Sequence, residues 1–230
     1  MLVLASRSPR RRELLAQGGY TFLVRPADIP EDPHPGEDPI AYVTRLARKK
    51  AEAVYAQMSS GENIAWPGEA TPARTSDQST RERMKGTDFG PYHRPSPTEG
   101  ASGAGRDLIV LGADTTVTLD NHILGKPVDT EDAGRMLRML SGRTHRVLTG
   151  IAVATGTRTE IAAEVTAVKF LTLSEEEIEA YVATGEPMDK AGAYAIQGRA
   201  ARWIPRIEGD YFNVVGLPIA LVSKIGRAHV

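Results

Sequence analysis

The pattern of hydrophobic and polar positions divides this chain into short apolar runs and longer stretches with helical spacing. Residues 2–5 and 108–112 are continuous apolar segments, which are typical of buried strands. Two longer runs, 146–154 and 159–173, are rich in β-branched residues and are joined by a Thr-Gly-Thr turn, which predicts a hairpin. A further strand is predicted over 201–207.

The stretches with helical spacing begin at recognisable start signals. Ser8-Pro9 and Asp38-Pro39 each join a favoured N-cap residue to proline at the first helical position. Thr130 before two acidic residues and the capping box Ser174-Glu175-Glu176-Glu177 predict two more helices. A last helix is expected from about residue 216. Because helices and strands alternate with some hairpins, we predict an α/β fold with a mixed sheet.

Residues 59–106 break this pattern, since they are rich in glycine, proline, serine, threonine and charge. That composition cannot offset its ordering entropy by burial, so we predict a disordered insertion within a single domain spanning 1–223. Residues 224–230 carry no structural signal and can be back-translated into a common sequencing adapter. We therefore expect a non-native tail over these seven residues.

The composition of the chain excludes several kinds of binding site. The formal net charge of −1 gives no global basic field for nucleic acid, so anions must bind locally. Without cysteines there are no thiolate sites, and the five histidines lack zinc-ligand spacing, which leaves oxygen-ligated Mg²⁺ or Mn²⁺. No apolar run approaches the roughly 20 residues that cross a bilayer. The charged N-terminal stretch is unlike a signal peptide, so we expect a cytoplasmic protein.

Ser6-Arg7-Ser8-Pro9-Arg10-Arg11-Arg12 is the most informative stretch of the sequence. It lies between a predicted strand and a helix N-terminus, where cations oppose the helix dipole. Free backbone N–H groups and guanidinium groups would together form an anion site, for which phosphate is the natural guest. The alternative is a solvated basic turn.

Other charged residues give weaker signals. Asp114, in Gly112-Ala113-Asp114-Thr115, is expected at a strand end, where a carboxylate could hold Mg²⁺ or accept a proton; an ordinary turn aspartate fits equally. Lys50 falls on the apolar stripe of the second helix, so it either snorkels to the surface or points into a cleft. Glu31 in an acidic loop and Lys126 in a turn are weak alone. Small residues around Gln197, over 189–198, suggest close backbone approach to a ligand.

Taken together, these segments resemble the Maf family of nucleotide pyrophosphatases. The matching motifs occur in family order and span nearly the whole chain outside 59–106 and the tail. They are Leu4-Ala5-Ser6-Arg7-Ser8-Pro9-Arg10-Arg11, Arg45-Leu46-Ala47 with Lys50-Ala51, Leu111-Gly112-Ala113-Asp114-Thr115, Gly125-Lys126-Pro127, Leu140-Ser141-Gly142 with Thr144-His145, Asp189-Lys190-Ala191-Gly192-Ala193-Tyr194 with Ile196-Gln197-Gly198, and Val214-Val215-Gly216-Leu217-Pro218.

The resemblance implies a two-lobed α/β fold around a long mixed sheet, with a nucleotide in the cleft between the lobes. It also implies a homodimer, a requirement for a divalent cation, and hydrolysis of dTTP and UTP. We expect Mg²⁺ or Mn²⁺ to bind phosphate oxygens and at least one of the two carboxylates Glu31 and Asp114. The residue roles that the resemblance implies place Asp114 as proton acceptor, supported by Glu31, Lys50 and Lys126, with Ser6, Arg10, Arg11, Thr115 and Gln197 binding the substrate.

Three other functions stay open at this point. One is a non-catalytic nucleotide binder that regulates cell division. Another is a pyrophosphatase for modified purine nucleotides or 7-methyl-GTP. The third is a simple phosphatase, which would release orthophosphate. Neither nucleic acid nor a membrane is expected as a partner.

Overall fold

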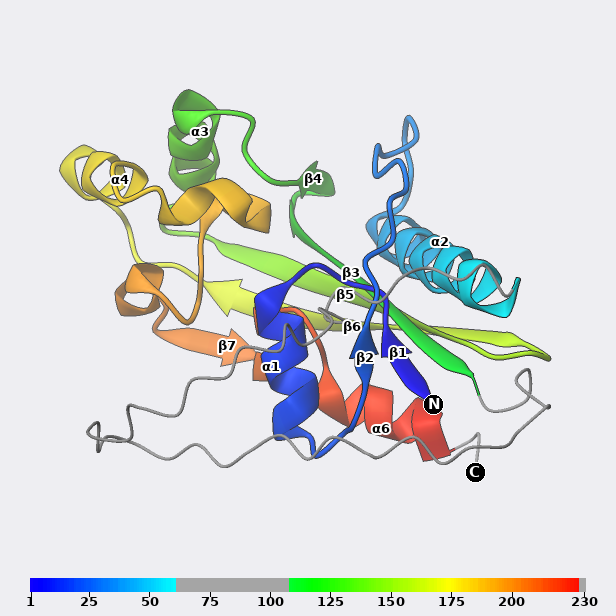
Figure 1. The fold of residues 1–230 in the computed structure, drawn as a ribbon. Coiled ribbons are helices and arrows are strands. Elements are labelled where there is room, and N and C mark those ends of the chain that lie inside the picture. The colour runs from blue at the N-terminus through cyan, green and yellow to red at the C-terminus, as the bar shows by residue number, and fades with distance from the viewer. Residues whose placement is uncertain (61–107, 228–230) are drawn as a thin grey trace, which may run out of the picture.

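A computed structural model describes residues 1–60 and 108–227 of the chain. A seven-stranded mixed sheet, ordered β2-β1-β3-β5-β6-β7 with β4 paired to β3, runs through the molecule (Figure 1). β1 runs parallel to β2 and β3, whereas the remaining neighbours are antiparallel. The strands are β1 (Leu2–Leu4), β2 (Leu23–Val24), β3 (Ile109–Leu119), β4 (His122–Leu124), β5 (Thr144–Ala154), β6 (Thr159–Lys169) and β7 (Arg206–Glu208). The predicted α/β class and mixed sheet are therefore confirmed.

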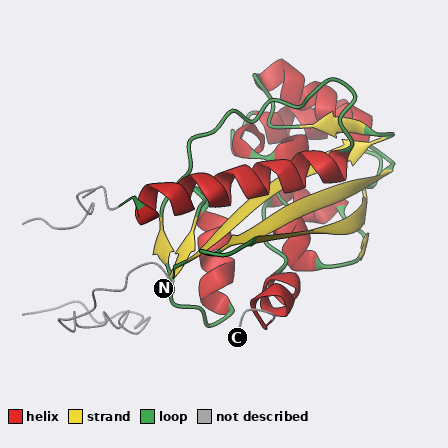
Figure 2. Ribbon diagram, turned by 90° about the vertical axis from the view of Figure 1, so that its right-hand side faces the viewer, coloured by secondary structure: helices red, strands yellow, loops and turns green. Residues whose placement is uncertain are grey.

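Helices cover both faces of the sheet, and α2 lies along one of them (Figure 2). Figure 1 shows α1 and α6 on the side away from α2, and α3 with α4 at the far end of the long strands. The α-helices are α1 (Pro9–Gln17), α2 (Pro39–Ser59), α3 (Thr130–Leu140), α4 (Glu175–Val182), α5 (Tyr211–Val215) and α6 (Ile219–Arg227), and the 3₁₀ helices are η1 (Glu186–Asp189), η2 (Ala191–Ala193) and η3 (Arg199–Trp203).

Most predicted starts are confirmed by hydrogen bonds at the helix ends. Ser8 and Asp38 cap α1 and α2 with their side chains, and Ser174 forms a capping box on α4 together with Glu177. At α3 the prediction was wrong by one residue. Asp129 is the N-cap, accepting from the Asp132 N–H, and Thr130 is already helical. Aspartate is at least as good an N-cap as threonine, because its carboxylate competes well for the free amides of the first turn.

Two strand predictions were wrong in extent. The segment 201–207 is mostly not a strand, because η3 runs through Trp203, which is buried in the core. Of this segment, only residues 206 and 207 belong to a strand, β7, which pairs with β6. Asp114 does not end a strand, since β3 continues five residues further to Leu119. There a two-residue turn with positive φ at Asp120 (49°) and Asn121 (65°) leads into β4.

Most of the predicted insertion falls outside the described residues, whereas the predicted tail falls partly within them. Of the segment 59–106, only Ser59, the last residue of α2, and its cap Ser60 are described. Of the tail 224–230, the first four residues continue helix α6, and Ile225 is buried. Among the described helices, none combines the length and apolarity that crossing a bilayer needs.

Candidate active site

A gap along one edge of β3 adjoins a large cleft. β1 pairs with β3 only as far as Leu111, and β4 begins to pair at Val117. Within the described ranges, residues 112–116 therefore have no partner strand on that edge. The gap opens at the carboxyl ends of parallel β1 and β2, where α/β sheets place their ligands. The cleft beside it has a volume of about 750 Å³.

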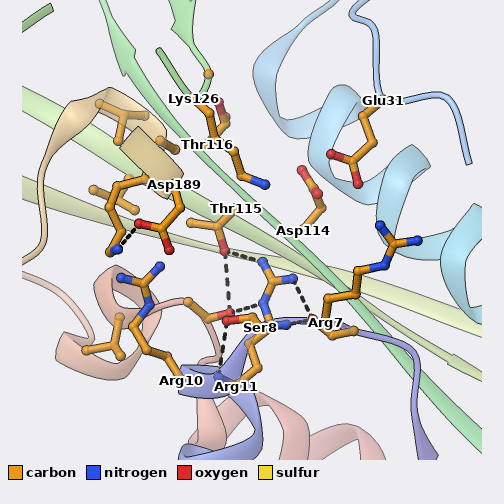
Figure 3. A pocket seen from close by; sticks show the side chains of 18 of the residues that line it. Arg7, Ser8, Arg10, Arg11, Glu31, Asp114, Thr115, Thr116, Lys126 and Asp189 are labelled. Carbon is orange, nitrogen blue, oxygen red and sulfur yellow. Dashed lines mark hydrogen bonds and ion pairs between the residues drawn. The ribbon is translucent and has the colours of Figure 1, made fainter. Parts of the chain in front are cut away.

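The structure brings every predicted site residue into this one cleft (Figure 3). The loop after β1 and helix α1 supply the basic segment, the loop after β2 supplies a carboxylate, and β3 supplies the residues at the open edge. The lining includes Ser6, Arg10, Arg11, Glu31, Lys50, Asp114, Thr115, Lys126 and Gln197. Their individual roles stay predictions.

Lys50 forms the centre of a charged cluster on the α2 side of the sheet. Its Nζ lies 2.7 Å from Asp114 Oδ1 and 2.5 Å from Glu31 Oε1. The side chains of Lys50 and Asp114 are each only 10% exposed, whereas that of Glu31 is 49% exposed. Of the two orientations that the sequence left open for Lys50, the one that points it into a cleft is correct.

The surroundings move the two carboxyl groups in opposite directions. Burial raises the pKa of Asp114, although the charges of Lys50 and Arg11 oppose the shift. Burial acts in the same direction on Glu31, but the hydrogen bond and charge of Lys50, helped by Lys126, lower its pKa overall. Carboxyl groups whose pKa values are pushed apart suit different chemical tasks. Asp114 is the better proton acceptor, and Glu31 keeps its negative charge.

Arg11 stabilises the open edge of β3. Its Nη1 donates to Ala113 O at 2.8 Å, a strand carbonyl that lies beyond the last residue of β1. Nε donates to Gly216 O at 2.8 Å, and Nη2 to Thr115 Oγ1 at 2.9 Å. Nη1 also reaches Ser6 Oγ at 3.3 Å. Arg11 was predicted to bind substrate, but its donors point mainly at the protein, so it joins separate segments of the chain and contributes charge to the cleft.

Other cations that line the cleft are more exposed than Lys50 and Arg11. Figure 3 shows Arg10 and Lys126 extending into it from opposite sides. Lys190 is also part of the lining and forms an ion pair with Asp189. With Lys50 and Arg11, these groups surround a space that suits a polyanion such as a triphosphate.

The sequence did not single out Tyr42, which also lines the cleft. Its hydroxyl donates to Glu31 O at 2.8 Å, so it holds the loop that carries this carboxylate. Burial and the nearby carboxylates of Asp114 and Glu31 raise its pKa to about 12. An aromatic residue in an amphipathic helix is usually part of the core, and no sequence signal marks this contact.

The described part of the chain offers few protein ligands for a metal ion. Among the described residues, no three acidic, histidine or cysteine side chains form a cluster that could hold one. Glu31 and Asp114 are joined through Lys50, and each uses one oxygen for that contact. Two carboxylates with remaining oxygens fit Mg²⁺, which proteins commonly bind through one or two carboxylates together with substrate phosphates.

The mixed sheet flanked by helices, with a cation-lined cleft at the carboxyl ends of β1 and β2, makes this an α/β protein with its candidate ligand site at the strand ends. The model of the family described as "Maf-like protein" matches residues 1–228, so the chain belongs to the Maf family. The resemblance found in the sequence motifs is thereby confirmed.

Curated relatives cover nearly the whole chain. A protein of Koribacter versatilis is 45% identical over 227 residues, covering 98% of this chain and 93% of its own. A Geobacter sulfurreducens protein is 47% identical over 225 residues, covering 97% and 93%. One from Aromatoleum aromaticum is 43% identical over 233 residues, again covering 97% of this chain and 93% of its own. Each of the three is named dTTP/UTP pyrophosphatase.

Proposed function

We propose that this chain is a nucleotide pyrophosphatase that hydrolyses dTTP and UTP to the nucleoside monophosphate and pyrophosphate. The observation that carries the proposal is the position of Asp114, which shares a cleft with Arg10 and Lys126 and is held by Lys50. Relatives that cover nearly the whole chain and bear the name of this activity support the choice of substrate.

In the proposed reaction, Asp114 takes a proton from a water molecule whose oxygen attacks the α-phosphorus. The bond from the α-phosphorus to the bridging oxygen breaks, and pyrophosphate leaves with the bonding electrons. Arg10, Lys50 and Lys126 offset the negative charge that accumulates on the phosphate oxygens. Positioning and electrostatics supply most of the rate in phosphoryl-type transfers, so the fixed cations matter as much as the base.

A divalent cation, Mg²⁺ or Mn²⁺, forms part of the proposal. Glu31 and Asp114 would hold it together with oxygens of the triphosphate, and when bound it would neutralise phosphate charge. The lowered pKa of Glu31 keeps one ligand ionised at neutral pH. The homodimer and the cytoplasmic location stay predictions.

Base choice is assigned to Gln197, with Arg10 and Thr115. An amide side chain offers both a donor and an acceptor, which matches the edge of a pyrimidine. Gln197 is exposed in the cleft and is followed by Gly198, where the chain turns into η3.

The test is a panel of nucleoside triphosphates assayed for each product, with and without a metal chelator. The proposal predicts monophosphate and pyrophosphate from dTTP and UTP, loss of activity with chelator, and recovery with Mg²⁺ or Mn²⁺. Binding without turnover would indicate a regulator instead. Preference for purine triphosphates or 7-methyl-GTP would indicate a purine-directed pyrophosphatase, and release of orthophosphate would indicate a simple phosphatase.

A further inference from the structure

Gln197 lies in a short segment whose backbone is hydrogen-bonded to side chains both before and after this residue. The backbone N–H groups of Ala195 and Arg199 lie two residues before and two residues after it. The N–H of Ala195 donates to Tyr181 at the end of α4, and the N–H of Arg199 donates to Glu186 at the start of η1. These two side chains are hydrogen-bonded to each other. We call this pair the Tyr181–Glu186 bracket.

The hydrogen bonds of the bracket have a defined direction. The N–H of Ala195 donates to Tyr181 Oη at 3.1 Å, and that hydroxyl donates to Glu186 Oε1 at 2.7 Å. The N–H of Arg199 donates to the same carboxylate, at 3.1 Å to Oε1 and 3.4 Å to Oε2. Burial raises the pKa of Tyr181, so the proton that it shares with Glu186 remains on the phenol.

Packing leaves the bracket little freedom. The Tyr181 residue is 2% exposed, and its ring meets Trp203 edge to face with the centroids 5.0 Å apart. Gly198 lies directly on the carboxylate, because an added Cβ would collide with the Glu186 side chain. The backbone on both sides of Gln197 is thus fixed against one anchor, while neither bracket residue lines the cleft.

We propose that Tyr181 and Glu186 are positioning residues. By fixing the backbone on both sides of Gln197, they set the position and orientation of its side chain in the cleft and thereby the base selectivity. A side chain that reads a base edge must be held to within a fraction of an ångström, and surrounding hydrogen bonds normally supply that precision. This role rests on the proposed function, in which Gln197 reads the pyrimidine.

The experiment compares kcat/KM for UTP and for GTP in variants of the full chain. In Gln197→Ala and in Tyr181→Phe, the UTP-over-GTP ratio should fall by about tenfold. The double variant should show no further fall, because Tyr181 acts through Gln197 and the two effects are then coupled. Glu186→Gln keeps the shape of the side chain but removes the carboxylate that accepts both hydrogen bonds. The UTP-over-GTP ratio of this variant should also fall.

Tyr20→Phe is the matched control. This change likewise removes a phenol hydroxyl, which contacts Ser223 Oγ at 2.7 Å. Tyr20 does not line the cleft, so the UTP-over-GTP ratio of this variant should equal that of the wild type. A melting curve shows whether Tyr181→Phe folds. If it does not, Glu186→Gln replaces it, alone and combined with Gln197→Ala, and the same ratios are compared.

Three results would overturn the proposed role of the Tyr181–Glu186 bracket. One is an equal fall of UTP and GTP turnover in the bracket variants, which would indicate a purely structural role. Additive losses in the double variant are another, and an unchanged ratio in Gln197→Ala is the third. If the wild type binds nucleotides but releases no pyrophosphate, the proposed function fails separately, and the same ratio taken from dissociation constants still tests the bracket.

Discussion

At the residue scale, the site is organised around a lysine shared by two carboxylates. Lys50 contacts both Asp114 and Glu31, yet only Asp114 is deeply buried. Because desolvation disfavours a buried charge, Asp114 has the raised pKa, whereas the half-exposed Glu31 gains more from the lysine than it loses by burial. The difference in burial thus accounts for the opposite pKa shifts of the two carboxyl groups.

The change Asp114→Asn tests the assignment of the base. The amide keeps the volume of the side chain but does not accept the proton, so we expect kcat to fall by about 10²- to 10⁴-fold. Steady-state kinetics with UTP measure the loss. A melting curve and nucleotide binding serve as controls for folding, and a variant with wild-type turnover would remove Asp114 from this role.

The sequence predicted which residues form the site better than how each one behaves. The basic segment 6–12 indicated an anion site through its residue types and its place before a helix. It did not separate Arg10, which extends into the cleft, from Arg11, whose donors are occupied by Ala113, Gly216 and Thr115. Those partners are distant in the chain, so no local spacing contains the information.

At the element scale, the site depends on how closely α2 lies on the sheet. Gly112 in β3 and Gly150 in β5 allow the contact, because an added Cβ would collide with Ala47 O at the first and with Val43 O at the second. The apolar stripe of α2 then packs directly on the strands, and Lys50 is carried to Asp114.

The change Gly112→Ala tests this close packing. The added methyl group has no space against the α2 backbone, so the helix must shift. We expect a loss of about 1–3 kcal/mol in the free energy of unfolding. Chemical denaturation measures the loss, and Gly125→Ala is the control, since its added Cβ meets no atom within 4 Å. Equal stability of the two variants would contradict the account of the contact.

Elements with strong local signals were predicted, and those decided by distant pairing were not. The caps at Ser8, Asp38 and Ser174 lie next to the helices that they start. The length of β3 depends instead on β4 and β5, which pair beyond Asp114 and extend the strand past its apolar run. Likewise, burial of Trp203 overrides the strand propensity of 201–207.

At the scale of the whole molecule, folding buries a histidine in its neutral form. His145 is 1% exposed, and its Nε2 lies 2.8 Å from Tyr194 Oη, a residue of the cleft lining. Burial lowers its pKa from 6.5 to about 3. The unfolded chain therefore binds more protons than the folded chain between these two values, and acid favours unfolding in that window.

We expect His145 to make stability depend on pH below its unfolded pKa. Its contribution is complete above pH 6.5 and is lost as the pH falls toward 3, at about 1.4 kcal/mol per pH unit. Denaturation at pH 7 and pH 5 should show a loss about 2 kcal/mol smaller in His145→Asn than in the wild type. Parallel losses in the two proteins would show that His145 titrates normally when folded.

The fold as a whole brings one buried carboxylate and several cations into the same cleft, and the proposed function has water attack the α-phosphorus there. The measurement that tests this point of attack most directly is hydrolysis of UTP by the wild-type chain in ¹⁸O-labelled water, with mass spectrometry of the products. Attack on the α-phosphorus predicts ¹⁸O in UMP and none in pyrophosphate. Label in the pyrophosphate, or release of labelled orthophosphate, would contradict it.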